Sequence, residues 1–241
     1  MHAYVINLVH AVDRRVYMEN VLKDIPSLNY EFIPAVDVRN LSEEKQIALF
    51  DKKHSEMRFA RRILPAEIGC TLSHQLCYKQ LLASDRNYAL ILEDDIILKG
   101  DLEKHMVFFD EFMNCDQPKI FLLSGYVWFF NKRKLKDITI SKVYNALLTH
   151  AYIINKAAAQ MIIEERPFIR ADNWLYIRKK GVQIYSIVPH IINQDWTGKF
   201  SSTIYSKNPL LKCYPIARLR IHLNGLILKL FKLIGHFEPP V

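Results

Sequence analysis

Residues 88–96 read YALILEDDI, and this stretch carries the clearest structural signal in the chain. An apolar run, Tyr88–Leu92, ends abruptly in three consecutive acids, Glu93, Asp94 and Asp95. A short apolar run without polar alternation is typical of a strand that is buried on both faces of a sheet. We therefore expect a central strand whose carboxyl end presents three carboxylates at one edge of the sheet.

Apolar strands and amphipathic helices alternate on either side of this strand. Strands are expected at 4–8, 30–35, 120–123, 147–154 and 182–188, and helices at 13–25, 42–50, 65–83, 101–114, 156–166 and 172–180. Pro65 suits the first position of its helix and Gly181 the residue just after one. Residues 125–142, rich in basic and aromatic side chains, are expected to form a loop or hairpin. The alternation predicts an α/β sheet sandwiched by helices.

The composition is that of a folded protein of one domain, or one domain with an appendage. Half of the 241 residues are hydrophobic and 24% are charged, which excludes disordered and collagen-like chains. The four cysteines show no CxxC spacing, and the first residues do not resemble a signal peptide. No apolar run reaches the roughly 18 residues of a membrane-spanning helix. These features favour a reduced, cytosolic protein.

Three adjacent carboxylates repel one another, which destabilises the folded state unless a cation or hydrogen-bond donors neutralise them. Ligands of open α/β sheets bind outside the carboxyl ends of the strands, and Mg²⁺ or Mn²⁺ prefers carboxylate oxygens. Of Glu93 and Asp95, one could hold a sugar hydroxyl and the other a diphosphate-bound metal. His150 and His190 are each a possible third ligand or a structural histidine. The alternative is a solvated acidic loop that caps the next helix.

A second group of possible ligands lies on the helix that begins at Pro65. Cys70, His74 and Cys77 follow the spacing i, i+4, i+7 and share one helical face, which invites a zinc interpretation. A fourth ligand is missing, so buried thiols beside a hydrogen-bonded histidine are the favoured interpretation. Ser73 and His74 are adjacent and cannot face each other on a helix, which argues against a nucleophilic Ser–His pair.

Several segments in sequence order resemble glycosyltransferase family 25, the lipopolysaccharide and lipooligosaccharide sugar transferases related to collagen galactosyltransferases. The segments are 5–8 (VINL) with Arg14-Arg15, 35–37 (AVD), 67–74 (EIGCTLSH), 91–95 (ILEDD), 150–154 (HAYII) with Ala158 and Ala159, Asp172, Pro189 with Gln194, and 202–204 (STI). Each match alone is weak, but their order over residues 4–204 is specific. Two positions depart from the family pattern: Glu93 begins the acidic triplet in place of Asp, and Ala158 replaces a glycine.

The resemblance implies a GT-A (Rossmann-like) fold, which we expect over residues 1–206. Residues 207–241 are expected to form a separate basic amphipathic tail. The resemblance also implies an inverting hexosyltransferase that uses UDP-galactose, with Mn²⁺ or Mg²⁺, and acts on a lipid-linked lipooligosaccharide or lipopolysaccharide acceptor. The expected location is cytoplasmic, peripheral to the inner face of the bacterial inner membrane.

The same resemblance suggests roles for individual residues. Asp172 is expected to be the catalytic base; alternatively it is only the N-cap of its helix. Trp174 would offer a flat face to a sugar or pack in the core. The metal is assigned to Asp95 and Glu93 with His190. Donor binding is assigned to Asn7, Asp37, Ser73, His74, Glu93, Asp94, Gln194 and Ser202, with Asn7 and Asp37 suited to the uracil or ribose.

The tail, residues 207–241, holds six basic residues against one acidic residue, together with ten large aliphatic or aromatic side chains between 219 and 234. This pattern suits a helix lying in the plane of an anionic membrane surface. The alternatives are a helix packed on the domain or a dimer contact. Residues 119–142 carry a similar basic excess.

Two other classes of protein fit parts of the sequence. A net charge of +8 would suit a nucleic-acid-binding module, which has no need of three carboxylates. A nucleotidyltransferase or phosphohydrolase would use the same acidic strand end but should show a glycine-rich phosphate loop, and the seven glycines do not cluster. The transferase hypothesis, with no nucleic-acid partner, is therefore preferred.

Overall fold

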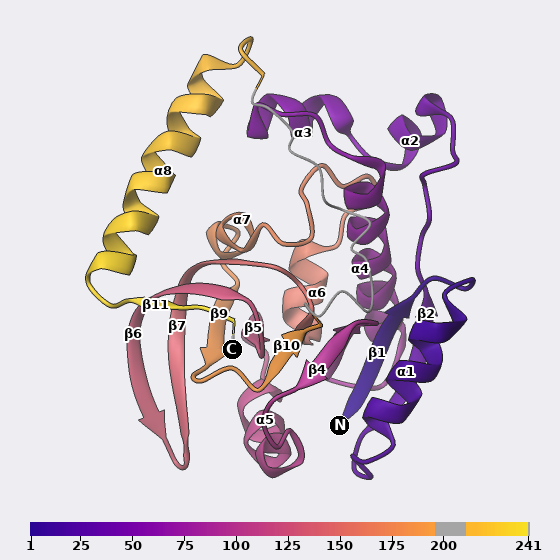
Figure 1. Cartoon of the computed structure of the whole chain (residues 1–241), viewed down its shortest axis with the longest axis vertical. Coiled ribbons are helices and arrows are strands. Elements are labelled where there is room, and N and C mark those ends of the chain that lie inside the picture. Colours follow the sequence, from indigo (N-terminus) through magenta and orange to yellow (C-terminus); the bar gives the residue numbers. More distant parts are fainter. Residues whose placement is uncertain (196–210, 241) are drawn as a thin grey trace.

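A nine-stranded mixed sheet forms the centre of the protein in the computed structural model, which describes residues 1–195 and 211–240 (Figure 1). In order across the sheet the strands are β11 (Phe237–Glu238), β6 (Tyr126–Leu135), β7 (Ile138–Leu147), β9 (Gln183–Ile187), β5 (Lys119–Leu122), β8 (Ala151–Asn155), β3 (Tyr88–Glu93), β1 (His2–Asn7) and β2 (Asn29–Pro34). A separate antiparallel pair joins β4 (Ile96–Leu98) and β10 (Ile192–Gln194). The predicted mixed α/β architecture, consistent with a GT-A fold, is confirmed.

Helices cover both faces of the sheet. The helices of the described residues are α1 (Val12–Leu22), α2 (Glu43–Leu49), α3 (Lys52–Phe59), α4 (Pro65–Ala83), α5 (Met106–Met113) after a short 3₁₀ turn η1 (Glu103–His105), α6 (Lys156–Ile162), α7 (Trp174–Lys179) and α8 (Pro215–Leu233). The core on one face contains α1 and α5, and the core on the other contains α4, α6 and α7. Both faces of the central strands are therefore removed from water.

Strand β1 shows how the two cores are divided. Ala3 and Val5 pack in the same cluster as Met18 of α1, whereas Tyr4 packs on the opposite face with Leu81 of α4. Successive side chains of a strand point to opposite faces, so an unbroken apolar run suits a strand covered on both sides.

The register of the sheet brings three segments to one edge. Strands β1 and β3 are parallel, with Ile6 paired to Glu93, so their carboxyl ends meet. Strand β8 runs antiparallel to β3, with Ala151 paired to Leu92, so the residues just before β8 arrive at the same place. The backbone N–H of Glu93 donates to the carbonyl of His150 at 2.9 Å. Parallel and antiparallel neighbours together assemble the site.

Helix α4 approaches the segment after β2 closely at Gly69. A Cβ atom at this position would collide with the carbonyl oxygen of Val36, so a side chain is excluded there. One turn later, Ser73 accepts a hydrogen bond from the backbone N–H of Val36 at 2.9 Å. The contact fixes the face of α4 that carries Cys70 and His74 beside the strand ends.

The hairpin and the strand after it differ from expectation. Residues 126–147 form a hairpin of two ten-residue strands, longer than the predicted 125–142 segment. The strand predicted at 147–154 starts at Ala151, because Leu148 adopts a positive φ of 76° and separates it from β7. Gly125 enters the hairpin with φ 115°, a conformation that favours glycine.

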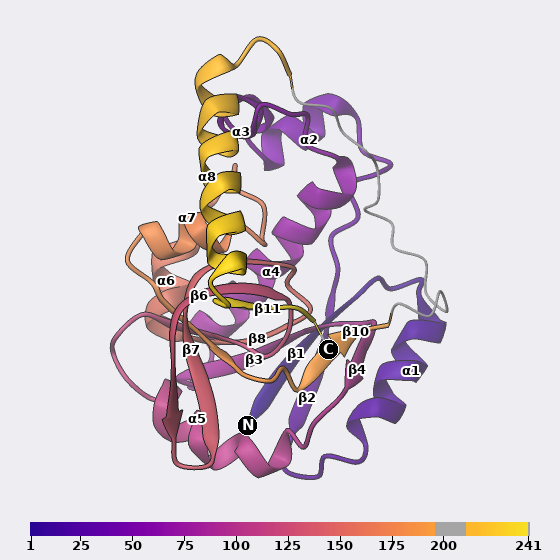
Figure 2. The same ribbon diagram turned by 60° about the vertical axis from the view of Figure 1, so that its left-hand side comes forward.

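The C-terminal tail is attached to this hairpin. Strand β11 pairs antiparallel with β6, with Phe237 opposite Trp128, and Phe231 of α8 stacks on Tyr144 with ring centroids 4.6 Å apart. Figures 1 and 2 show α8 standing along the outer side of the molecule, from the hairpin to α3. The 206/207 boundary lies outside the described residues. Among residues 1–195 and 211–240, no helix combines the length and apolarity needed to cross a bilayer.

Candidate active site

The three adjacent acids have three different environments. Both carboxylate oxygens of Asp94 are hydrogen-bonded: Arg14 Nη1 donates to Oδ1 at 2.5 Å, and Asn7 Nδ2 donates to Oδ2 at 2.8 Å. Burial nevertheless raises the pKa of Asp94 above its ordinary value, against the opposing effect of Arg14 and Asn7. Asp94 therefore fixes β1, α1 and β3 to one another.

Asp95 is only half satisfied. Its Oδ2 accepts from Gln194 Nε2 at 2.9 Å and from Arg14 Nη1 at 3.3 Å. Its Oδ1 is buried without a hydrogen-bond partner among the described residues. Burial and the nearby charge of Glu93 raise the pKa of Asp95. A buried carboxylate oxygen without a partner is costly, and a cation would relieve this cost.

Glu93 lies among one hydroxyl group and two imidazole rings. Thr149 Oγ1 donates to Oε1 at 2.5 Å, His150 Nδ1 lies 3.3 Å from Oε2, and His74 Nε2 lies 3.5 Å from Oε1. Burial alone would raise the pKa of Glu93, but the nearby imidazoles of His150 and His74 hold it well below the ordinary value. Glu93 is thus an ionised acceptor at the centre of the site.

Two groups of side chains could hold a metal ion among the residues that the structure describes. One consists of Glu93, Asp95 and His150, and in each group the ligand atoms lie within 4.8 Å of one another. His190 belongs to neither group: it is buried beside the backbone of Gly125 on the hairpin side of the molecule. The assignment of His190 as third ligand is wrong, because the approach of β8 to β3 places His150 there instead.

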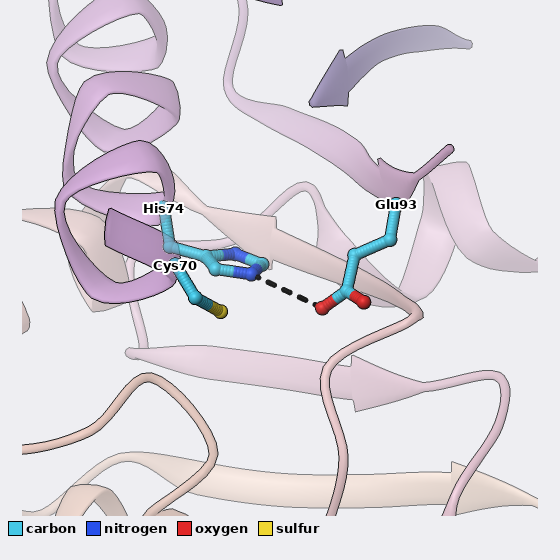
Figure 3. A group of neighbouring side chains, drawn as sticks. All are labelled: Cys70, His74 and Glu93. Atoms are coloured by element: carbon cyan, nitrogen blue, oxygen red, sulfur yellow. Dashed lines mark ion pairs between the residues drawn. The ribbon is translucent and has the colours of Figure 1, made fainter. Parts of the chain in front are cut away.

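The second group consists of Cys70, His74 and Glu93 (Figure 3). Cys77, which shares the helical face in the sequence pattern, is fully buried in the core instead and does not join them. The zinc alternative of Cys70, His74 and Cys77 is therefore not assembled, whereas the favoured interpretation fits: Cys77 is a buried thiol, and His74 is hydrogen-bonded through Nδ1 to Tyr152 Oη at 2.8 Å.

Of the two metal-ligand groups, Cys70, His74, Glu93 and Asp95 line a pocket of about 350 Å³ between α4, α1 and the strand ends. Seven of the predicted site residues line it: Asp37, Ser73, His74, Glu93, Asp94, Asp95 and Gln194. Asn7 stands behind the wall, where it supports Asp94. At the rim, Arg39 pairs bidentately with Asp37, at 2.8 and 2.5 Å, and this pairing lowers the pKa of Asp37 to about 2.

Asp172 lies outside this lining, near enough to Cys70 to act on it electrostatically. The charges of Glu93 and Asp172, after burial, raise the pKa of the Cys70 thiol. Asp172 Oδ1 is 3.7 Å from Arg170 Nε. The N-cap of α7 is Asn173, whose side chain accepts from the N–H of Tyr176, so the capping interpretation of Asp172 is wrong. Ser202 lies outside the described residues.

Trp174 packs in the core. It is fully buried, contacts the ring of Tyr152 edge-on, and donates from Nε1 to the carbonyl of Leu148 at 2.8 Å. Its ring is unavailable to a sugar, and the alternative of core packing is confirmed.

Sequence reasoning missed the direct roles of Arg14, Arg39 and Thr149. Arg14 precedes the acids by eighty residues, but it lies in the first turn of the helix that follows β1 and so points to the carboxyl end of the sheet. Arg39 and Thr149 lie in segments between elements, where no periodic pattern marks a function. Only Arg14, as part of the family-like Arg14-Arg15 pair, carried a signal.

The family assignment follows from comparison with known proteins. The chain matches Glycosyltransferase family 25 (LPS biosynthesis protein) over residues 1–173. It is 26% identical to "Glycosyltransferase 25 family member" of Aedes aegypti over 89% of this chain and 35% of that one. It is 23% identical to "Lacto-N-neotetraose biosynthesis glycosyltransferase LgtE" of Neisseria meningitidis, over 81% of this chain and 74% of that one.

A human relative, "Procollagen galactosyltransferase 2", is 23% identical over 68% of this chain and 28% of that one. The chain spans about a third of the length of the insect relative and less of the human one. The family match covers well over half of the chain and includes β1, α4, β3 and β8, which together build the pocket. The chain therefore belongs to glycosyltransferase family 25.

Proposed function

We propose that the protein transfers a hexose, galactose in the first instance, from a UDP-sugar to a saccharide hydroxyl with inversion at the anomeric carbon. The observation that carries the proposal is the unpartnered, buried Oδ1 of Asp95 beside Glu93 and His150 in a pocket of about 350 Å³. The names of LgtE and procollagen galactosyltransferase support the reaction class and, for the latter, the sugar.

The residues of the pocket fit a hard divalent cation. Glu93, Asp95 and His150 would hold Mn²⁺ or Mg²⁺ through two carboxylates and one imidazole, which are ordinary ligands of these ions. When bound, the ion would supply positive charge to the diphosphate of the donor. Gln194 and Arg14 hold Asp95 from the other side, so they orient its free oxygen toward the pocket.

The rim of the pocket suits the nucleoside. Asp37 and Arg39 offer a carboxylate and a guanidinium held in a fixed bidentate pair, which can meet the hydroxyls of a ribose and the negative charge of a phosphate. Ser73 is occupied by backbone groups, accepting from Val36 and donating to the carbonyl of Gly69 at 2.7 Å, so its contribution is to position the wall.

Inversion requires one in-line displacement. The acceptor hydroxyl oxygen forms a bond to the anomeric carbon, the bond to the diphosphate oxygen breaks, and the hydroxyl proton passes to a base. Asp172 is proposed as that base, since its carboxylate acts electrostatically on Cys70 of the pocket wall and does not cap α7. The ion pair with Arg170, itself 3.4 Å from Glu67, holds Asp172 in place.

The test is a donor screen with UDP-galactose, UDP-glucose and UDP-N-acetylglucosamine, with and without Mn²⁺, using product analysis for anomeric configuration. Turnover of one donor with inversion supports the proposal. Absence of metal-dependent UDP binding and of transfer with every donor would overturn it. Asp172→Asn should lower kcat by roughly 10²-fold or more with unchanged donor binding, and near-normal kcat would remove Asp172 from the mechanism.

The acceptor is proposed to be lipid-linked, because α8 presents a surface suited to a membrane. Its outward apolar side chains, Ile216, Leu219, Leu223, Leu226, Ile227, Leu230, Leu233 and Ile234, are between 40% and 84% exposed. The four formally charged residues of the helix are all basic: Arg218, Arg220, Lys229 and Lys232. An apolar stripe edged by cations fits an anionic bilayer surface. The insect and human relatives extend the family beyond lipopolysaccharide synthesis, so the tail is the basis of this proposal.

Co-sedimentation with phosphatidylglycerol vesicles tests the surface. We expect binding that weakens with salt and is lost when Leu223 and Leu230 are both replaced by serine, whereas neutral vesicles bind weakly. Vesicle binding that these changes leave unaffected would contradict a role of α8 in membrane binding. A concentration-dependent dimer that the same changes dissociate would show instead that this face contacts a second copy of the chain. The proposed location, the cytoplasmic face of a bacterial inner membrane, depends on this result.

A further inference from the structure

His74 presents a ring nitrogen toward the pocket that no side chain satisfies well. The residue is 1% exposed, and Nε2 is buried without a hydrogen-bond partner among the described residues, with Glu93 Oε1 as an ion-pair contact at 3.5 Å. A buried polar atom left in this way usually marks strain or an absent ligand.

The other nitrogen of the ring is held by a buried hydroxyl chain. His74 Nδ1 lies 2.8 Å from Tyr152 Oη, which in turn lies 2.8 Å from Tyr78 Oη. When Nδ1–H donates to Tyr152, Tyr152 can donate to Tyr78, and the lone pair of Nε2 faces the pocket. Histidines that bind metals are commonly held in this way, with the second nitrogen bonded to a fixed partner.

Cys70 completes the group. It precedes His74 by one helical turn on the same face of α4, and both side chains reach toward Glu93 at the end of β3 (Figure 3). The sulfur, an imidazole nitrogen and a carboxylate oxygen all lie within 4.8 Å of one another. Thiolate with imidazole is the ligand pair of zinc and similar ions, in contrast to the carboxylate-rich group of Glu93, Asp95 and His150.

We propose that Cys70, His74 and Glu93 form a second, thiophilic metal site, which takes Zn²⁺ or Co²⁺ with three protein ligands and one open position. Binding releases the proton of the Cys70 thiol to solvent, so the affinity increases with pH. Glu93 belongs to both groups, so the two sites share one ligand residue.

The test uses the full chain, reduced and stripped of metal, titrated with Co²⁺ alone. A thiolate-bound cobalt ion has a near-ultraviolet charge-transfer band that carboxylate and imidazole ligands do not give. We expect this band in the wild type, its loss in Cys70→Ser and Cys70→Ala, and at least about a 10-fold weaker Zn²⁺ affinity in the same variants. Cys213→Ser is the matched control, because Cys213 is an exposed cysteine on the tail.

Two further measurements separate this site from the proposed transferase site. Asp95→Asn should keep the cobalt band, because Asp95 is a ligand of the other group only. Zn²⁺ should raise the thermal midpoint of the wild type and of Cys213→Ser but not of Cys70→Ser, with circular dichroism confirming that each variant is folded. Absence of the band in the folded wild type, or its retention in Cys70→Ser, overturns the proposal. Neither readout depends on sugar transfer, so a failed donor screen leaves this test intact.

Discussion

The pocket at the ends of β1 and β3 and the outer face of α8 satisfy their side chains in opposite ways. In the pocket, Asp94 and Asp95 are buried and most oxygens of the acidic triplet have a named partner, with Asp95 Oδ1 as the exception on the triplet. On α8, large apolar side chains lie open to solvent between basic residues. The hydrogen bonds of the pocket hold its side chains in fixed positions, as a reaction requires. The exposed apolar surface of α8 lowers its free energy only when another molecule or surface covers it.

The largest expected effect is the loss of activity on replacing Asp95, whose Oδ1 has no partner in the pocket. Asp95→Asn should lower kcat/KM by about 10³-fold, because it removes a ligand for an ion that supplies several kcal/mol of charge stabilisation. Steady-state kinetics with saturating Mn²⁺ measures it. Asp13→Asn, the same change at an exposed position on the pocket rim, should leave kcat/KM close to the wild-type value. Equal losses in both variants would contradict the role given to Asp95.

Replacement of Asp94, the neighbouring acid, should mainly lower the stability of the fold. Asp94→Asn breaks the part-buried pair with Arg14 and should lower the free energy of unfolding by about 3 kcal/mol. Urea denaturation measures this loss. Asp37→Asn breaks the more exposed pair with Arg39 and serves as the control, with a loss below about 1 kcal/mol. A larger loss in Asp37→Asn than in Asp94→Asn would show that burial does not separate the two pairs.

His190, on the hairpin side, links stability to pH. Burial lowers its pKa from 6.5 to about 4, so the unfolded chain takes up a proton before the folded chain does. Its contribution to stability is present above pH 6.5 and is lost as the pH falls toward 4. Between pH 7 and pH 5 the loss should be about 2 kcal/mol. His190→Gln should show a flatter pH dependence of urea unfolding, and an unchanged slope would exclude the residue as its source.

The smallest expected effect concerns the two faces of α8. Leu219 and Leu230 are 58% and 56% exposed, so serine at either position should change the free energy of unfolding by less than about 0.5 kcal/mol. Phe231, stacked on Tyr144, should cost about 2 kcal/mol when replaced by alanine. Urea denaturation of the three variants compares them. A large loss at Leu219 would show that the outward face is already covered in the folded chain.

Periodic segments of the sequence predicted most of the fold. The apolar runs at 4–8 and 88–92 became β1 and β3, and the helix expected from Pro65 to Ala83 is α4 with the same bounds. The predictions failed where the sequence lacks a periodic pattern or where the backbone adopts an uncommon conformation. Leu148, with its positive φ, divides a run of apolar residues that reads as one strand.

The acids of the candidate site could be predicted, but not which partner binds which acid. Glu93, Asp94 and Asp95 are visible because they interrupt an apolar strand. Their distinct roles depend on Asn7, Arg14, Thr149 and His150, which come from three other segments. His150 and His190 are equivalent on sequence grounds, and only the pairing of β8 with β3 chooses between them.

The sequence by itself determined the alternation of strands and helices, the acidic edge of the sheet and the family resemblance, because each is written in neighbouring residues. The tertiary structure decided which carboxylate keeps a free oxygen, that Glu93 rather than Cys77 meets Cys70 and His74, and that the end of the tail pairs with the hairpin. These outcomes depend on contacts between residues far apart in the chain. Local pattern carries no information on them, because strand register and helix packing are set by the whole sheet.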